Sequence, residues 1–367
     1  MKITRIAAYQ VPLTSHATYY MAEGKTCATV TTTLVALETN SGLTGWGEIC
    51  PIPGYLPAYA GGVVPAVAEL AEVLLGADPI GPEALGAAMD RKLVDHRYAK
   101  SAIDIALWDL TAQAAGLPLS ALLGGRRSAD LPLYHSITCV DPHEMARIAE
   151  EAYGTGIRQF QAKLGADGDW AADAARLRLV REAVGPGPLV YGDWNCGATR
   201  LHATRVGRAV ADCDVMLEQP CATLEACAAV RAATGLPMKL DELAHDTGTL
   251  LRAHALGCMD AVALKISKFG GLSAARRARD LCLHLGAQMC VECVWGSDVI
   301  TAAALHLAAA TDPAMVLNVC DLSGYVAPRL HPSAPVRANG RIAPPDGPGL
   351  GVRPDPALIG DPVALFD

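Results

Sequence analysis

The segment from residue 189 to residue 241 decides the fold, because three short apolar runs in it each end on an acid: Leu189-Val-Tyr-Gly-Asp193, Val215-Met-Leu-Glu218 and Met238-Lys-Leu-Asp241. Segments with helical periodicity separate the runs. The terminal acids are 25 and 23 residues apart, about the length of one strand-plus-helix unit. This repeat predicts parallel strands that each present a carboxylate at the carboxyl end.

The repeat continues in both directions along the chain. Further apolar runs bring the number of expected strands to eight, at intervals of roughly 23 to 30 residues. The added runs are Leu131–Thr138, Gln159–Leu164, Ala261–Lys265, Gln288–Glu292 and Val316–Val319. Eight such units favour a closed (β/α) barrel with its active site at the carboxyl ends of the strands. An open doubly wound sheet is the alternative, but no Gly-x-Gly-x-x-Gly motif follows any of these runs.

Residues outside this repeat follow other patterns. Residues 1–60 contain three runs with strand character, Ile3–Val11, Thr29–Thr39 and Leu43–Glu48, and helical periodicity follows at 63–75 and 99–115. The end of the chain, from about Gly324, is rich in Pro and Gly and is expected to be a loop-rich surface segment. We therefore expect an α+β capping domain, a barrel and a C-terminal segment at residues 1–125, 126–323 and 324–367.

Composition excludes several classes of protein. The 367 residues are 51% hydrophobic and 19% charged, which suits a large core. The net charge of −8 and the lack of a long basic run argue against a nucleic-acid partner. The first residues are too polar for a signal peptide, and no run reaches the ~18 apolar residues of a membrane span. Twelve cysteines without disulfide-framework spacing suit a reducing compartment, so we expect a cytoplasmic protein.

Asp193, Glu218 and Asp241 would lie side by side at the mouth of such a barrel. Carboxylates that close together cannot all stay ionised in a site of low dielectric constant without a counter-ion. Oxygen ligands suit a hard cation, and three carboxylates suit Mg²⁺. The pattern therefore predicts one Mg²⁺ per subunit at these residues; the alternative is three unrelated surface carboxylates.

Two lysines end further strands of the predicted barrel. Lys163 ends the second run and Lys265 the sixth, nearly opposite each other in a closed barrel. A partly desolvated lysine near a divalent cation has a lowered pKa and can act as a base. It could remove the proton alpha to a carboxylate whose enediolate form Mg²⁺ stabilises. The other lysine would return a proton, giving racemisation or epimerisation, or protonate a leaving group, giving β-elimination. Lys268 is expected to be a solvated loop charge.

Several longer motifs carry a family resemblance. They are Gly-Trp-Gly-Glu at 45–48, Ala-Lys-Ser-Ala-Ile-Asp-Ile-Ala-Leu-Trp-Asp-Leu at 99–110, Leu-Leu-Gly-Gly at 122–125, Leu-Glu-Gln-Pro at 217–220, Leu-Asp-Glu at 240–242 and Lys-x4-Gly-Gly from 265. Over nearly its whole length the chain resembles the mandelate racemase/muconate lactonizing enzyme branch of the enolase superfamily. The resemblance implies a (β/α)7β barrel, an α+β cap with specificity loops in its 20s and 50s, and a C-terminal segment that returns to the cap.

The resemblance also implies roles for single residues. It implies metal ligands at Asp193, Glu218 and Asp241 and catalytic bases at Lys163 and Lys265. Asn195 falls where members often have a polar residue near the ligands, and Glu242 directly follows the third ligand. Muconate-lactonizing members carry Lys-x-Lys on the second strand, whereas the first position here is Gln161. Lys163 therefore lacks the electrostatic helper of those members.

Other stretches resemble members that act on proline derivatives. They include Cys50-Pro-Ile-Pro-Gly-Tyr55 and Trp295-Gly-Ser-Asp298, which make Tyr55, Trp295 and Asp298 candidate substrate-binding residues. The implied activities are dehydration of cis-3-hydroxy-L-proline and 2-epimerisation of hydroxyproline betaine. A small amino-acid-like carboxylate is thus the expected substrate, and a homo-oligomer the expected assembly. A sugar-acid dehydratase and a non-catalytic binding protein are less favoured.

The charge on the substrate nitrogen separates the two activities. A quaternary ammonium needs an aromatic cage, whereas a secondary ammonium needs a polar acceptor. The eighth run ends Asn318-Val-Cys-Asp321, without Trp or Phe, so we favour the free imino acid with Asp321 as its amine partner. Asp321 could instead cap a helix. The cap tyrosines Tyr19, Tyr20, Tyr55 and Tyr59 could still build a cage.

Overall fold

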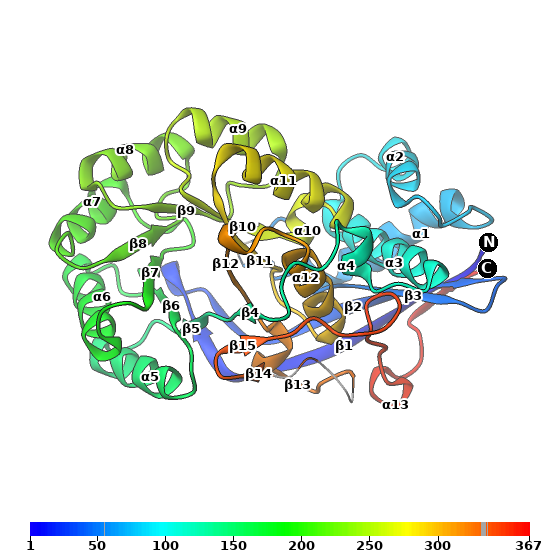
Figure 1. Cartoon of the computed structure of the whole chain (residues 1–367), viewed down its shortest axis with the longest axis horizontal. Coiled ribbons are helices and arrows are strands. Elements are labelled where there is room, and N and C mark those ends of the chain that lie inside the picture. The colour runs from blue at the N-terminus through cyan, green and yellow to red at the C-terminus, as the bar shows by residue number, and fades with distance from the viewer. Residues whose placement is uncertain (55, 332–334, 336) are drawn as a thin grey trace.

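Eight parallel strands form the barrel in a computed structural model, which describes residues 1–54, 56–331, 335 and 337–367 (Figure 1). The strands follow one another in chain order: β5 (His135–Ile137), β6 (Gln159–Lys163), β7 (Leu189–Asp193), β8 (Val215–Glu218), β9 (Met238–Leu240), β10 (Ala261–Lys265), β11 (Gln288–Glu292) and β12 (Val316–Val319). A parallel bridge between Leu133 and Val319 joins the first part of the barrel to the last strand. The predicted (β/α) barrel is confirmed.

Helices lie around the barrel and cover its outer face (Figure 1). They are α5 (Pro142–Gly154), α6 (Trp170–Val184), α7 (Arg200–Ala209), α8 (Leu224–Thr234), α9 (Thr247–Ala255), α10 (Ile266–Phe269), α11 (Leu272–Leu285) and α12 (Asp298–Ala309). In α5 the buried residues Met145, Ala149 and Ala152 recur at steps of four and three, so one face packs on the sheet. The carboxylate of Asp141 caps the first turn of α5 by accepting from two backbone N–H groups.

The cap combines an antiparallel sheet with helices. Its strands are β1 (Ile3–Tyr20), β2 (Thr26–Thr39) and β3 (Thr44–Ile49), and its helices are α1 (Val63–Leu74), α2 (Pro82–Lys92), α3 (Arg97–Ala115) and α4 (Leu119–Leu122). Gly45 and Gly47 let α3 approach β3 closely, because a Cβ at Gly47 would lie 1.8 Å from the carbonyl oxygen of Ala102. The first run predicted in the cap ends at Val11, whereas β1 continues to Tyr20, since a mostly exposed ribbon with β2 shows no clear apolar alternation.

The cap contacts the barrel at several places, and two of them involve its sheet. The buried Glu48 carboxylate accepts from Ser297 N (2.7 Å), Ser297 Oγ (2.8 Å) and Ile300 N (2.9 Å) at the start of α12. At the far end of β1, Tyr20 N donates to Thr138 Oγ1 (2.7 Å) and Tyr20 O accepts from Cys139 N (3.1 Å). The barrel is therefore tied to the cap sheet near the end of β3 and at the end of β1, and Ser273 of α11 adds hydrogen bonds to Asp104 and Trp108 of α3.

The C-terminal segment joins the cap sheet. Strands β13 (Val326–Ala327) and β16 (Ala364–Phe366) both pair antiparallel with β1, and the two chain ends lie close together in Figure 1. The remaining short elements are β4 (Leu131–Pro132), β14 (Arg337–Ala338), β15 (Arg341–Ile342), α13 (Pro356–Ile359) and four 3-10 turns, η1 to η4, at Ala22–Gly24, Ala60–Gly62, Pro313–Met315 and Leu322–Tyr325. None of the helices in the described part of the chain has the length and apolar character that crossing a bilayer requires.

Candidate active site

The expected acids and lysines gather at the carboxyl ends of β6 to β10. Lys163 pairs in register with Asp193, and Asp193 with Glu218, so their side chains point to the same side of the sheet. Glu218 lies opposite Lys239, and Asp241 follows two residues later on the same side, directly after β9. The predicted clustering of Asp193, Glu218 and Asp241 is thus present, with all three carboxylates 0–1% exposed.

Each of these carboxylates is paired with a lysine. Lys163 Nζ lies 2.5 Å from Asp193 Oδ2, and Lys265 Nζ lies 2.6 Å from Asp241 Oδ2. Burial lowers the pKa of Lys163, but attraction to Asp193 and Glu218 outweighs burial, so the pKa is raised overall. The ion pairs therefore favour the ammonium form of Lys163 in the chain as it stands.

Two further lysines complete the pairing: sequence reasoning assigned no role to Lys239 and wrongly predicted that Lys268 is solvated. Lys239 is fully buried inside the barrel, with Nζ 2.9 Å from Glu218 Oε1 and 4.5 Å from the centre of the Tyr191 ring. Lys268, expected to be solvated, is only 4% exposed and lies 2.9 Å from Asp241 Oδ1. The sequence held one signal for Lys239: it stands two positions before Asp241 and so shares its inward face.

The donor set fits a hard divalent cation. The pKa of Glu218 is raised to about 7, because burial and repulsion from Asp193 and Asp241 disfavour its charge, although Lys239 favours it. A dication beside these oxygens would relieve that repulsion. Within the described residues no three acidic, His or Cys side chains are already arranged as a metal site, and a lysine is paired with each of the three carboxylates. A cation would have to compete with these ammonium groups for the same oxygens.

Polar neighbours hold the carboxylates in place. Gln161 Nε2 donates to Asp193 Oδ2 (3.1 Å) and to Glu218 Oε2 (2.7 Å) and so bridges the two acids. Asn195 Nδ2 donates to Asp193 Oδ2 (3.2 Å) and Glu242 Oε1 (3.1 Å). Burial and repulsion from Asp241 and Asp193 raise the pKa of Glu242 to about 8. These three residues thus lie beside the expected ligands.

A hydrogen-bonded acid outside the cavity holds the strand ends that carry Lys163 and Asp193. The buried Asp173 of α6 accepts from Gly165 N (3.0 Å), two residues beyond Lys163. Its second oxygen accepts from the indole Nε1 of Trp194 (2.9 Å), which directly follows Asp193. Arg176 Nη1 (2.8 Å) and His202 Nε2 (2.8 Å) complete its partners. Asp173 therefore fixes where the two chain segments leave the barrel.

A cavity with about 550 Å³ of empty volume, part of it open to solvent, lies next to the lysines. Lys163, Lys265 and Trp295, an expected substrate-binding residue, line it. Glu292 at the end of β11 also lines it, only 2% exposed, with Oε2 accepting from Tyr134 Oη at 2.6 Å. Sequence reasoning noted Glu292 as a strand-end charge without giving it a role. Tyr55, another expected substrate residue, lies outside the described residues.

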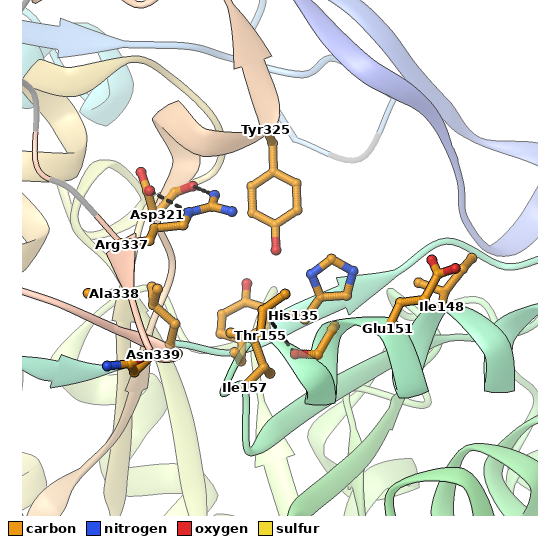
Figure 2. Close-up of a pocket in the computed structure, with 14 residues that line it drawn as sticks. His135, Ile148, Glu151, Thr155, Ile157, Asp321, Tyr325, Arg337, Ala338 and Asn339 are labelled. Carbon is orange, nitrogen blue, oxygen red and sulfur yellow. Dashed lines mark hydrogen bonds and ion pairs between the residues drawn. The ribbon is translucent and has the colours of Figure 1, made fainter.

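Two expected substrate-binding acids are engaged elsewhere. Both oxygens of Asp298 hold the C-terminal segment, through Leu330 N (2.8 Å), His331 N (3.0 Å) and Arg329 Nε (2.9 Å). Figure 2 shows Asp321 paired with Arg337, in a separate pocket between α5 and the β14–β15 hairpin.

The hydrogen bonds of Asp321 engage both of its carboxylate oxygens. Oδ2 accepts from Arg337 Nε at 2.7 Å, while Oδ1 accepts from Ser323 Oγ (2.6 Å) and Gly324 N (3.1 Å). Asp321 is thus a helix cap and an ion-pair partner, and these contacts do not favour its expected role as the partner of the substrate amine, which stays a prediction. The contacts of Asp298 likewise do not favour its expected role in substrate binding.

Comparisons with known proteins agree with this architecture. Residues 4–124 match the mandelate racemase/muconate lactonizing enzyme N-terminal domain, and residues 144–358 match the enolase C-terminal domain-like family. The chain is 41% identical to a cis-3-hydroxy-L-proline dehydratase of Roseibium aggregatum, covering 100% of both chains. It is 30% identical to a hydrophobic dipeptide epimerase of Enterococcus faecalis, covering 84% of this chain and 88% of that protein.

Solved structures give the same result. A member of the enolase superfamily from Roseovarius nubinhibens ISM, complexed with magnesium, has a TM-score of 0.94 at 37% identity and covers 100% of this chain and 99% of its own. Another mandelate racemase/muconate lactonizing enzyme from that organism has a TM-score of 0.94 at 35% identity, covering 100% and 98%. The chain is therefore an enzyme of the mandelate racemase/muconate lactonizing enzyme family, within the enolase superfamily.

Proposed function

We propose that this enzyme dehydrates cis-3-hydroxy-L-proline, with Asp193, Glu218 and Asp241 as ligands of one Mg²⁺. The observation that carries the proposal is the pair Lys163 and Lys265, which line one cavity from separate strands, each beside an expected ligand. The dehydratase that is 41% identical over the full length supports the choice of substrate. When bound, the cation would supply electrophilic stabilisation of the negative charge that develops on the substrate carboxylate.

The two lysines divide the proton transfers. Lys163, as the neutral amine, takes the alpha proton of the (S)-configured substrate, an assignment that follows the family resemblance. Lys265, as the ammonium, gives a proton to the departing hydroxyl. The Cα–H and Cβ–O bonds break, a Cα–Cβ double bond forms and water leaves. The enamine then tautomerises to the cyclic imine Δ1-pyrroline-2-carboxylate.

The stereochemistry of the substrate suits two opposed lysines. A hydroxyl cis to the carboxylate lies on one face of the ring, and the alpha hydrogen lies on the other face. Removal of the hydrogen by one lysine and protonation of the hydroxyl by the other is therefore an anti elimination. Gln161 contributes by holding Asp193 and Glu218 at fixed positions through one amide group.

Glu292 replaces Asp321 as the proposed partner of the substrate ammonium. It is the acid that lines the cavity from the end of β11, and Tyr134 holds one of its oxygens at 2.6 Å. A carboxylate is the acceptor that a secondary ammonium prefers, because the hydrogen bond is charge-assisted. This pairing favours a free imino acid over a betaine, which has no N–H to donate.

A second candidate function is 2-epimerisation of hydroxyproline betaine. The observation that favours it is an aromatic cluster of Tyr19, Trp295 and Tyr325 along the cavity, with ring centres 5.4 to 6.0 Å apart. Aromatic faces attract quaternary ammonium groups. In that reaction the second lysine would return a proton to the alpha carbon and no bond to oxygen would break.

Incubation with each compound in D₂O, followed by NMR, tests the proposal. With Mg²⁺ present, cis-3-hydroxy-L-proline should yield the cyclic imine; EDTA should abolish turnover and Mg²⁺ should restore it. Formation of the betaine epimer with cis-3-hydroxy-L-proline untouched would establish the second candidate instead. Full activity in metal-free enzyme would contradict the assigned role of the cation.

Variants separate the roles of the side chains. Lys163→Ala should block exchange of the alpha proton, whereas Lys265→Ala should retain some exchange but complete no dehydration. Glu218→Gln should lower activity by several orders of magnitude, since it removes the charge of the central proposed ligand. Lys92→Ala, which removes an exposed lysine of α2, is the matched control and should behave as wild type. Normal turnover in either active-site lysine variant would refute the two-lysine mechanism.

A further inference from the structure

The aromatic cluster of Tyr19, Trp295 and Tyr325 forms one wall of the cavity and comes from three parts of the chain. Tyr19 belongs to β1 of the cap, Trp295 to the loop after β11, and Tyr325 to the turn after β12. The Trp295 ring lies 5.4 Å from the Tyr19 ring and 6.0 Å from the Tyr325 ring, centre to centre. The wall therefore lies at the junction of the cap and the barrel.

The polar groups of the three aromatic side chains differ in whether they have hydrogen-bond partners. Tyr19 Oη donates to Ser136 O (3.3 Å), and Tyr325 Oη accepts from Ser136 N (3.2 Å), so both hydroxyls are held by one residue of β5. The indole Nε1 of Trp295 is buried and has no hydrogen-bond acceptor among the described residues. Buried donors without acceptors are rare, because leaving one unpaired is unfavourable. Trp295 is thus the donor of this wall that is left for a ligand.

The chemistry of the indole limits what it can bind. An indole N–H donates and cannot accept, so it cannot pair with the substrate ammonium. The substrate carboxylate is assigned to the cation that the acids at the ends of β7 to β9 would hold, whereas Trp295 follows β11. The acceptor that remains on the proposed substrate is its ring hydroxyl. We infer that Trp295 donates a hydrogen bond from Nε1 to this hydroxyl, an inference that rests on the proposed dehydration.

Such a bond acts on the departure of water. As the Cβ–O bond breaks, its electrons move to the oxygen, which becomes negative until the proton from Lys265 reaches it. A donor aimed at that oxygen binds more strongly in the transition state than in the bound substrate and so accelerates the step. Because surrounding atoms bury Nε1, neighbouring groups must move aside for the substrate hydroxyl to reach it. Trp295 is then a catalytic residue for elimination and has no part in removal of the alpha proton.

The experiment compares two rates of Trp295→Phe, which keeps an aromatic ring and removes the N–H. The Mg²⁺-loaded enzyme turns over cis-3-hydroxy-L-proline in D₂O, and NMR follows both imine formation and deuterium entering the alpha position of unreacted substrate. Imine formation should fall about ten- to a hundredfold, the scale of one hydrogen bond to a charged group. Alpha exchange should persist, so the ratio of exchange to elimination rises by a similar factor. Because both rates come from the same molecules, partial loss of folded protein does not alter this ratio.

Trp170→Phe is the matched control, since Trp170 is an exposed tryptophan at the start of α6, and its ratio should equal that of wild type. An unchanged ratio in Trp295→Phe, with both rates normal or both reduced in parallel, would overturn the inference, because the ring would then only pack. A wild-type enzyme that neither exchanges nor dehydrates this compound would refute the proposed function itself and this inference with it.

Discussion

Replacement of Asp173 by Asn tests whether the hydrogen-bonded acid behind the active site supports both stability and catalysis. Asp173 is fully buried, and each oxygen accepts from two donors. Asn has the same size but one oxygen, so its amide NH₂ must face one pair of donors. Either Trp194, or Gly165 together with Arg176, then loses its acceptor.

The expected loss follows from these contacts. A buried donor left unpaired destabilises by about 1–3 kcal/mol. The attraction to Arg176 also weakens, although Asp167 still pairs with Arg176 at 2.6 Å. Asp173→Asn should therefore lower the free energy of unfolding by about 2–4 kcal/mol. Because Asp173 fixes the segments that follow Lys163 and Asp193, turnover should also fall, by about tenfold, through misplacement of the base.

Urea unfolding and turnover of the folded fraction measure the two effects. Asp169→Asn is the matched control on the same helix, because Asp169 caps α6 through Ala171 N and Asn caps about as well as Asp. A change in unfolding free energy below about 0.5 kcal/mol for Asp173→Asn, equal to that of the control, would refute the argument. Lost stability with normal turnover would limit Asp173 to a structural role.

Three further variants test other assignments. Glu292→Gln should raise KM for cis-3-hydroxy-L-proline about ten- to a hundredfold in steady-state kinetics, because the ammonium loses a charged acceptor; an unchanged KM would exclude the pairing. Asp321→Asn should lower the urea midpoint and leave KM unchanged, since Asp321 holds Arg337 and not the substrate. Burial raises the pKa of Asp104 to about 6 from 3.8, so its neutral form stabilises the fold below about pH 4 and that contribution is lost as pH rises through 6. Urea midpoints at pH 4, 5 and 6 should show wild type losing stability relative to Asp104→Asn across this window, and parallel curves would contradict the assignment.

The barrel could be predicted from sequence because its strands are buried on both faces. Runs such as Leu189–Asp193 and Ala261–Lys265 match β7 and β10 in full, since uninterrupted apolar bodies with charged ends leave few other interpretations. The first run, 131–138, was predicted less well. It divides into β4 and β5, because Leu131 and Pro132 pair with β15 of the C-terminal segment, a contact over more than 200 residues.

Residues whose role depends on distant partners escaped prediction. Asp298 and Asp321 look like substrate acids because they stand near the ends of the last strands. Their partners lie in the Pro- and Gly-rich C-terminal segment, which has no periodicity from which a fold position can be inferred. Lys268 looked solvated because local sequence does not reveal that Asp241 lies beside it.

The attachments of the cap limit how a substrate can enter. A lid joined at one edge can swing on a hinge, but the cap is held at Glu48 against α12, by Tyr20 against Thr138 and Cys139, and by Asp104 and Trp108 of α3 against Ser273 of α11. Rotation of the whole cap would break one of these sets of hydrogen bonds. Admission and release should therefore depend on small local motions of loops, which are faster than domain rotations. Likewise, a chimera that places a relative's cap on this barrel must match all of these attachments, or the wall carrying Tyr19 will be set at the wrong angle.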